Sequence, residues 1–279
     1  MIRATTQDRP AIEAFLTKHI ATSMFPLSNL RRYGMTGDHR HVVSFWVRWQ
    51  DGMITDVLTM TNEGGLFPQC PTGPWGAIKA VLAGTAIMGA LGDAGQVSAL
   101  RHALGLCERP AMDTQEPLYR LRLAALRMPD VTGFSLRPLA QAPRDLVIGW
   151  RHAYINEVMP MPGEDAARKA ADDIAVYSAA DTHRVLYEED MPVAMTGFNA
   201  TLPNAVQIGG VYTPPAQRSR GLARRAVAMH LSEARGKGVT DASLFAASPQ
   251  ACKAYEALGF ARTGAFAILI FPEPQVIYG

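Results

Sequence analysis

Residues 206–238, VQIGGVYTPPAQRSRGLARRAVAMHLSEARGKG, constrain the fold more than any other stretch of the chain. A strand-like segment ends at Pro214-Pro215, a short loop follows, and an amphipathic helix begins near Gly221. A loop that opens a helix offers unpaired main-chain N–H groups and the positive end of the helix dipole, a combination that suits phosphate. Positive charge is added around the same turn by Arg218, Arg220, Arg224 and Arg225. The sequence therefore predicts an anion-binding site here.

The composition is that of an ordinary soluble globular protein. The chain has 279 residues, 48% of them hydrophobic and 19% charged, which suits one large domain or two of usual size. The formal net charge of +2 argues against a broad nucleic-acid-binding face, because such a face needs a much stronger basic balance. We therefore expect no nucleic-acid partner.

The cysteines and the apolar runs predict a cytoplasmic location. Cys70, Cys107 and Cys252 are far apart and form no C-x-x-C pair, a pattern typical of reduced thiols. The N-terminus carries charges where a signal peptide needs an apolar core. The longest apolar run, 80–91, is interrupted by glycines and is shorter than the ~20 residues that cross a bilayer. We expect no membrane partner.

Helices and strands alternate along the chain in two similar sets. Apolar periodicity predicts helices at 8–22, 27–33, 73–83, 94–104, 144–158, 166–175, 221–235 and 249–258. Strands are predicted at 41–49, 53–60, 85–91, 118–126, 135–138, 185–187, 193–199, 206–213, 242–247 and 266–271. Gln50-Asp51-Gly52 is a strong hairpin signal between the first two strands.

The order of elements predicts two domains built on one fold. Residues 128–138 contain two prolines and a glycine, so we place the boundary near Asp130, giving domains 1–130 and 131–279. Both sets run helix, helix, hairpin, strand, helix, strand, helix, strand. We expect an α/β (α+β) fold class, with a central mixed, mostly antiparallel sheet flanked by helices in each domain.

The loop at Arg218–Ala223 fits the pattern R-x-x-G-x-A. Gly221 admits a close approach of an oxygen to the chain, and a small residue at Ala223 keeps the first helical turn slim. Pro214-Pro215 removes two main-chain donors and separates this strand from its neighbour, which frees the main chain of 211–213 for an extended, amide-bearing ligand. The alternative is an ordinary loop-to-helix junction with solvated arginines.

A second pattern lies downstream in residues 248–260, SPQACKAYEALGF. Helical spacing places Ala251 and Tyr255 on one face, and Gly259 suits the end of the helix. Together the two segments resemble the GCN5-related N-acetyltransferase (GNAT) family, in which a Q/R-x-x-G-x-G/A loop precedes a helix with the pattern Asn-x-x-Ala-x-x-x-Tyr-x-x-x-Gly-Phe. Ser248 stands where that pattern has asparagine. The resemblance covers about residues 133–279.

The resemblance implies two tandem acyl-CoA N-acyltransferase-like domains and a role for each matching residue. Tyr255 would donate a proton to the departing CoA thiolate. The residues expected to hold acetyl-CoA are Val211, Tyr212, Thr213, Arg218, Ser219, Arg220, Gly221, Leu222, Ala223, Arg224 and Ser248. The chain is then expected to be an enzyme that moves an acetyl group from acetyl-CoA, its cosubstrate, to a primary amine of a small molecule by direct attack, with no metal.

Several alternatives remain open on the sequence alone. The strand before the loop offers no carboxylate as general base, and Glu157 is one candidate. A non-catalytic acyl-CoA-binding or regulatory module would carry the same loop, and so would a nucleotide-phosphate enzyme, although the P-loop lysine and serine are missing. His39-Arg40-His41 is more simply a solvated strand start than a metal site. The stretch 69–76, which corresponds to the loop, lacks the arginine, so the N-terminal half resembles a degenerate domain that does not bind CoA productively.

Overall fold

The computed structural model describes residues 1–158, 163–246 and 248–279, and the chain divides into two compact units. The first unit comprises Met1–Leu118 together with Gly264–Gly279, and the second comprises Tyr119–Thr263. No described helix has the length and apolarity that a membrane span requires.

The first unit is a mixed sheet with helices. Its strands are β1 (Ile2–Arg3), β2 (Val43–Gln50), β3 (Met53–Thr61), β4 (Gly65–Gln69), β5 (Ala86–Asp93) and most of β12 (Ala261–Val276). Its helices are α1 (Arg9–Lys18), α2 (Ile20–Tyr33), α3 (Trp75–Leu82) and α4 (Ala94–Leu104). The expected single helix at 8–22 is wrong, because α1 ends at Lys18 and α2 starts at Ile20.

The second unit has the same kinds of element in the same order. Its strands are β7 (Phe134–Pro138), β8 (His183–Glu188), β9 (Met191–Thr201), β10 (Ala205–Tyr212), β11 (Asp241–Phe245) and the end of β6 (Met112–Arg122). Its helices are α5 (Arg144–Val158), α6 (Gly163–Ala179), α7 (Leu222–Gly236) and α8 (Pro249–Ala257). A strand was expected at 242–247, and β11 ends at Phe245. Position 247 of the expected strand lies outside the described part of the chain.

The two sheets share one topology. Strand order is β1-β2-β3-β4-β5-β12 in the first unit and β7-β8-β9-β10-β11-β6 in the second. In each, the first four strands pair antiparallel, and the fourth and fifth, β4–β5 and β10–β11, pair parallel. The expected fold class is therefore confirmed: mixed α/β with a mostly antiparallel sheet and flanking helices.

The division of the chain differs from the boundary expected near residue 130. The second unit begins at Tyr119, because Tyr119 and Leu121 of β6 pack in one cluster with Val227 of α7. Residues 264–279 return to the first unit, since Phe266–Ile270 pair antiparallel with β5. The prolines near residue 130 mark the connection that follows β6, whereas packing sets the division earlier.

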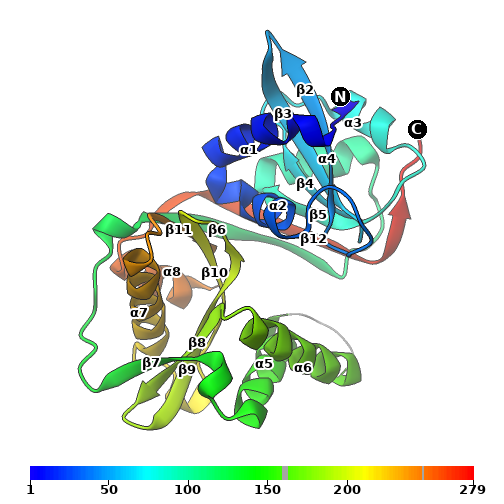
Figure 1. Ribbon diagram of the computed structural model, residues 1–279. Coiled ribbons are helices and arrows are strands. Elements are labelled where there is room, and N and C mark those ends of the chain that lie inside the picture. Colours follow the sequence, from blue (N-terminus) through cyan, green and yellow to red (C-terminus); the bar gives the residue numbers. More distant parts are fainter. Residues whose placement is uncertain (159–162, 247) are drawn as a thin grey trace. The chain divides into compact units, whose positions relative to one another are not determined.

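Alternation along β8 places different helices on the two faces of the second sheet. Leu186 packs with Leu222 and Ala226 of α7, whereas Val185 and Tyr187 pack with the cluster around α5 and α6. In Figure 1, α7 and α8 cover one face of these strands while α5 and α6 lie on the other. The strand therefore carries side chains to two distinct environments.

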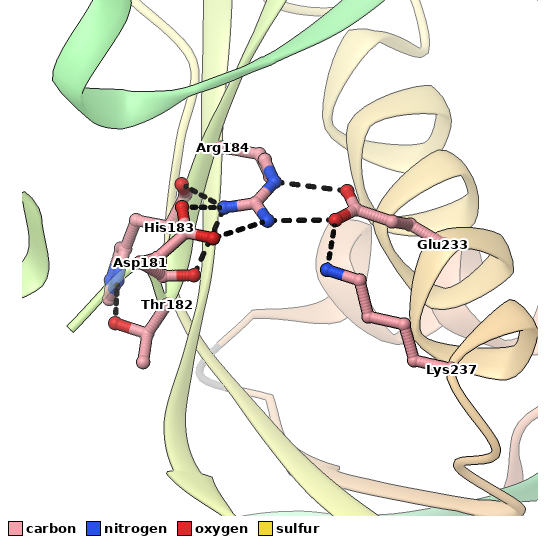
Figure 2. Close-up of polar contacts among 6 residues, drawn as sticks. All are labelled: Asp181, Thr182, His183, Arg184, Glu233 and Lys237. Carbon is pink, nitrogen blue, oxygen red and sulfur yellow. Dashed lines mark hydrogen bonds and ion pairs between the residues drawn. The ribbon is translucent and has the colours of Figure 1, made fainter.

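An ion pair between a buried arginine and a partly exposed glutamate joins α7 to β8 (Figure 2). The guanidinium of Arg184, whose side chain is 5% exposed, donates to both carboxylate oxygens of Glu233 at 2.9 and 2.7 Å. Asp181 accepts from the same guanidinium at 2.7 Å, and Lys237 donates to Glu233 at 2.6 Å. This bidentate geometry fixes the orientation of α7 on the sheet.

We predict that Glu233→Gln lowers the free energy of unfolding at neutral pH by about 2 kcal/mol, because Arg184 stays buried and loses one of its two charged partners while Asp181 remains. The hydrogen bond from Arg184 lowers the pKa of Glu233 from 4.5 to about 2. The folded-state pKa thus lies below the unfolded one, so the wild-type advantage is complete above pH ~4.5 and is lost as the pH falls toward 2. Urea unfolding across this pH range measures it.

The matched control is Glu108→Gln, which removes the same charge from an exposed residue. It should leave the free energy of unfolding within about 0.5 kcal/mol of wild type at every pH. An equal loss in both variants would contradict the role given to Arg184.

Candidate anion-binding site

The loop before α7 has the backbone geometry of an anion seat. Ser219 and Gly221 both adopt positive φ, 64° and 72°, a region that side chains other than glycine seldom enter. Gly221 is the residue before the helix and no side chain caps it. The N–H of Arg225 donates to the carbonyl of Gly221 at 3.1 Å, so the N–H groups of the preceding turn have no helical acceptor. These donors meet the positive end of the helix dipole.

Two arginines of the loop are held by carboxylates. Arg218 donates to both oxygens of Glu157 at 2.7 and 2.9 Å and to the carbonyl of Thr213 at 3.0 Å. Arg220 donates to both oxygens of Glu188 at 2.8 and 2.9 Å. All four side chains are 37–45% exposed, so each pair contributes little to stability and an incoming anion can compete for the arginine.

Two polar atoms beside this turn are buried without a partner in the described part of the chain. They are Nε of Arg224, in the first turn of α7, and Oγ1 of Thr213, just after β10. An unpaired buried polar atom costs about 1–3 kcal/mol. Both atoms belong to residues that sequence analysis expected at the cofactor, and both would gain from a ligand that supplies hydrogen-bonding groups.

The pairing between strands β10 and β11 ends shortly before the loop. Their parallel pairing covers Ala205–Gln207 against Asp241–Ser243, although β10 continues to Tyr212. The register of β10 against β9 shifts between Gly209 and Tyr212, with Gly210 at φ 63°. This shift is a β-bulge, a local insertion of one residue. It places Val211 in the part of β10 that no longer pairs with β11. The described pairing of β10 with β11 thus ends before residues 211–213, which is the separation that the proline pair predicts.

The side chains of Val211 and Tyr212 at the end of β10 pack against different helices. Tyr212 is buried against Trp150 of α5, with ring centroids 6.3 Å apart. Burial, then the charge of Glu157, raises the pKa of Tyr212. Val211 is partly buried and packs on the α7 side. The side chain of Tyr212 is thus part of the core.

Helix α8 carries the two remaining sequence-predicted residues. Tyr255 lies in the same core cluster as Val227 of α7 and meets Phe260 edge-on at 5.9 Å. The hydroxyl of Ser248 accepts from the N–H of Ala251 at 3.2 Å and caps the helix. Serine can therefore be explained at this position by helix capping, apart from any ligand.

The candidate base Glu157 lies at the loop, where both of its oxygens hold Arg218. One buried side chain near the site was not expected from the sequence: the imidazole of His183 on β8. Glycines at 197 and 210 lie against its ring. No local motif marks this histidine, since its neighbours come from other strands.

The corresponding region of the first unit is filled by the protein itself. The described pairing of β4 with β5 covers only Gly65 and Leu66. Beyond it, the side-chain oxygen of Gln96 on α4 accepts from the N–H of Cys70 at 2.5 Å. The carboxylate of Asp56, which is fully buried, accepts from the N–H of Thr72 at 2.9 Å. An internal carboxylate thus takes a main-chain donor of the loop.

We predict that Glu188→Gln strengthens the binding of inorganic pyrophosphate by about 2–5-fold at low salt, because it releases Arg220 from an ion pair of at most about 1 kcal/mol. Glu189→Gln removes the same charge one residue away, from a side chain that does not hold Arg220 in the described structure. It should change affinity by much less. Calorimetric titration of both variants decides, and equal effects would mean that only net charge matters.

Comparison with known proteins agrees with this geometry. Residues 151–260 match the model of the Acetyltransferase (GNAT) family. A search of curated protein sequences finds no match to the chain. Solved structures with a similar fold include a GCN5-related N-acetyltransferase from Kribbella flavida, with a TM-score of 0.55 and 18% identity over 91% of this chain and 95% of that one.

Two further structures resemble the chain over nearly its whole length. One is a tandem GNAT protein from the clavulanic acid biosynthesis pathway, without AcCoA, with a TM-score of 0.55 and 12% identity over 98% of both chains. The other is a Drosophila protein with a TM-score of 0.64 and 15% identity over 97% of this chain and 99% of that one. At these identities the likeness establishes a shared fold.

Proposed function

From a GNAT-family domain over residues 151–260, we propose that the protein transfers an acetyl group from acetyl-CoA to a primary amine of a small molecule. The observation that carries the proposal is the open N-terminus of α7. There, left-handed Ser219 and Gly221 precede free N–H groups, beside the point where β10 has left β11. That arrangement offers a pyrophosphate seat and an extended strand edge in succession, which suits the length of CoA.

In this proposal the pyrophosphate of the cofactor lies at the later residues, near the start of α7, and the pantetheine arm extends back toward the earlier residues at the end of β10. The main-chain N–H groups of Leu222, Ala223 and Arg224 bind the pyrophosphate, with Arg218, Ser219, Arg220 and Gly221 around it. The pantetheine amides pair with the main chain of Val211, Tyr212 and Thr213. Ser248, already the cap of α8, would add a hydroxyl contact.

The chemistry follows from the thioester. The amine nitrogen attacks the carbonyl carbon directly, without a covalent enzyme intermediate, and the C–S bond breaks. Tyr255 donates its phenolic proton to the departing thiolate. Its place in a well-packed cluster with Val227 holds the phenol in one orientation, as a proton donor requires.

We further propose that only the second unit binds the cofactor. In the first unit Asp56 holds the N–H of Thr72 and Gln96 holds the N–H of Cys70. A phosphate would have to displace a buried carboxylate, and a pantetheine amide would have to displace Gln96. Acetyl transfer in the cytoplasm by the second unit alone is the function that we assign.

The decisive experiment is a panel of primary amines, amino acids and aminoglycosides, with acetyl-CoA consumption followed by release of free thiol. Turnover with any amine supports the enzyme. Tight binding of acetyl-CoA without turnover on the whole panel would favour a non-catalytic acyl-CoA-binding module. Failure to bind acetyl-CoA at all would overturn the proposed function.

Tyr255→Phe should lower kcat by about 10²-fold and leave the dissociation constant of acetyl-CoA within about threefold, because only the phenolic proton is lost. The matched control is Tyr119→Phe, since Tyr119 lies in the same cluster and donates its hydroxyl to Glu256 at 2.7 Å. An unchanged kcat in Tyr255→Phe would rule out the proton-donor role.

Calorimetry should find one acetyl-CoA per chain. Gly221→Ala should weaken binding by about tenfold, because an alanine relaxes out of the left-handed conformation that costs it about 1–2 kcal/mol. Gly73 also has positive φ, 66°, before α3, so Gly73→Ala is the control and should leave the affinity unchanged. Two molecules per chain would contradict the filled first unit.

A further inference from the structure

A buried imidazole lies against the bulge of β10. His183 is 0% exposed, and its ring stacks on Tyr177 of α6 with centroids 3.7 Å apart and planes inclined by 8°. Its cross-strand partner is Gly197, where a Cβ would overlap the ring. The absence of a side chain on β9 is therefore what allows the imidazole to lie flat on this face of the sheet.

The Nε2 atom of this imidazole points at the bulge. It lies 2.9 Å from the position that a Cβ of Gly210 would occupy, and Gly210 is the left-handed residue within the register shift. This Nε2 has no hydrogen-bond partner in the described residues. Since buried polar atoms are nearly always paired, its direction indicates a partner that a ligand supplies.

The proposed function places the reacting group near that atom. With the pyrophosphate at 218–223 and the pantetheine along 213–211, the next part of the cofactor, the thioester, arrives at Gly210. Glu157 and Glu188 are bound to arginines of the loop. The imidazole of His183, by contrast, adjoins Gly210 directly.

The other ring nitrogen, Nδ1, has a partner that is closer to the protein surface. Nδ1 lies 3.0 Å from Oγ1 of Thr182, a half-buried residue (Figure 2). If Nδ1 carries the proton and donates it to the hydroxyl, then Nε2 is left as an acceptor. One ring thus joins the bulge of β10 to a hydroxyl at the edge of the core.

The surroundings of the ring favour its neutral form. Burial lowers the pKa of His183 well below 6.5, with further lowering from His230 on α7, Arg151 on α5 and Arg184 on β8. Tyr177, which faces the ring from α6, stays a neutral phenol because burial raises its pKa to about 12. The charged imidazolium is therefore disfavoured here. A ring that accepts one proton while it donates another stays neutral throughout.

We propose that His183 is the proton acceptor of the transfer and relays the proton to Thr182. As the amine nitrogen forms its bond to the carbonyl carbon, its N–H proton passes to Nε2. The Nδ1 proton passes to Oγ1 of Thr182, and the hydroxyl proton of Thr182 passes to water. The C–S electron pair leaves with the thiolate, which takes its proton from Tyr255. This inference rests on the proposed acetyl transfer.

The test uses the full chain and the amine that the panel identifies. His183→Gln should lower kcat by about 10²–10³-fold, with acetyl-CoA affinity within about threefold of wild type. Thr182→Val removes the hydroxyl from a side chain of the same shape and should lower kcat by about tenfold, and Thr182→Ser should restore most of it. Wild-type kcat in His183→Gln, or in Thr182→Val, would overturn the relay while leaving the proposed function intact.

A matched control distinguishes the relay from a structural role. His230 is also buried, has an Nδ1 without a partner in the described residues, and stacks on Phe198 at 3.8 Å. His230→Gln should leave kcat within about threefold. If both histidine variants lose kcat equally, the loss reflects packing and the relay is wrong.

A second measurement needs no variant and no amine. Nitrogen-15 spectra of histidine-labelled wild type report the tautomer of His183 directly, and His183→Gln assigns its signal if it folds, or Thr182→Val by its shift if it does not. We expect a proton on Nδ1, an unprotonated Nε2, and a change at Nε2 when acetyl-CoA is added. A proton on Nε2 would overturn the relay. Absence of acetyl-CoA binding in the wild type would instead reject the proposed function.

Discussion

The separation of β10 from β11 beyond Gln207 is the constraint on which the candidate site depends. A strand inside a sheet has its main-chain groups paired on both edges, and the bulge at Gly210 with the proline pair after it ends that pairing. The main chain that results must be satisfied by something other than the sheet. It leads directly to the N–H groups in the first turn of α7, so one break in pairing places an unpaired strand edge next to an uncapped helix N-terminus.

The unpaired strand edge and the N-terminus of α7 stay adjacent only if the position of α7 on the sheet is fixed. The helix begins without a side-chain cap at Gly221, which leaves its first turn available to a ligand and contributes nothing to holding it. Its position is fixed further along by the bidentate contact between Arg184 and Glu233 and by the packing of Val227 and Leu231. Binding donors at one end and structural anchors at the other are thus separated along a single helix.

In the first unit, which has the same topology, the corresponding main-chain N–H groups are paired within the protein. Its described parallel pairing of β4 with β5 covers two residue pairs, against three for β10 with β11 in the second unit. The donors at the end of β4 are taken by Gln96 and by the buried carboxylate of Asp56. A fold that must leave main-chain groups unpaired can satisfy them with a cofactor or with its own side chains.

The sequence by itself determined the local features: the loop and helix at 218–236, the hairpin at Asp51-Gly52, and the resemblance carried by Tyr255 and Gly221. These depend on residues close together in the chain, where proline, glycine and helical spacing act directly. Only the tertiary structure decided that Asp56 holds Thr72 and that His183 lies over Gly197 and points at Gly210. It also decided that residues 264–279 complete the first unit. Those contacts join strands whose pairing is set by packing of the whole sheet, and no short pattern encodes them.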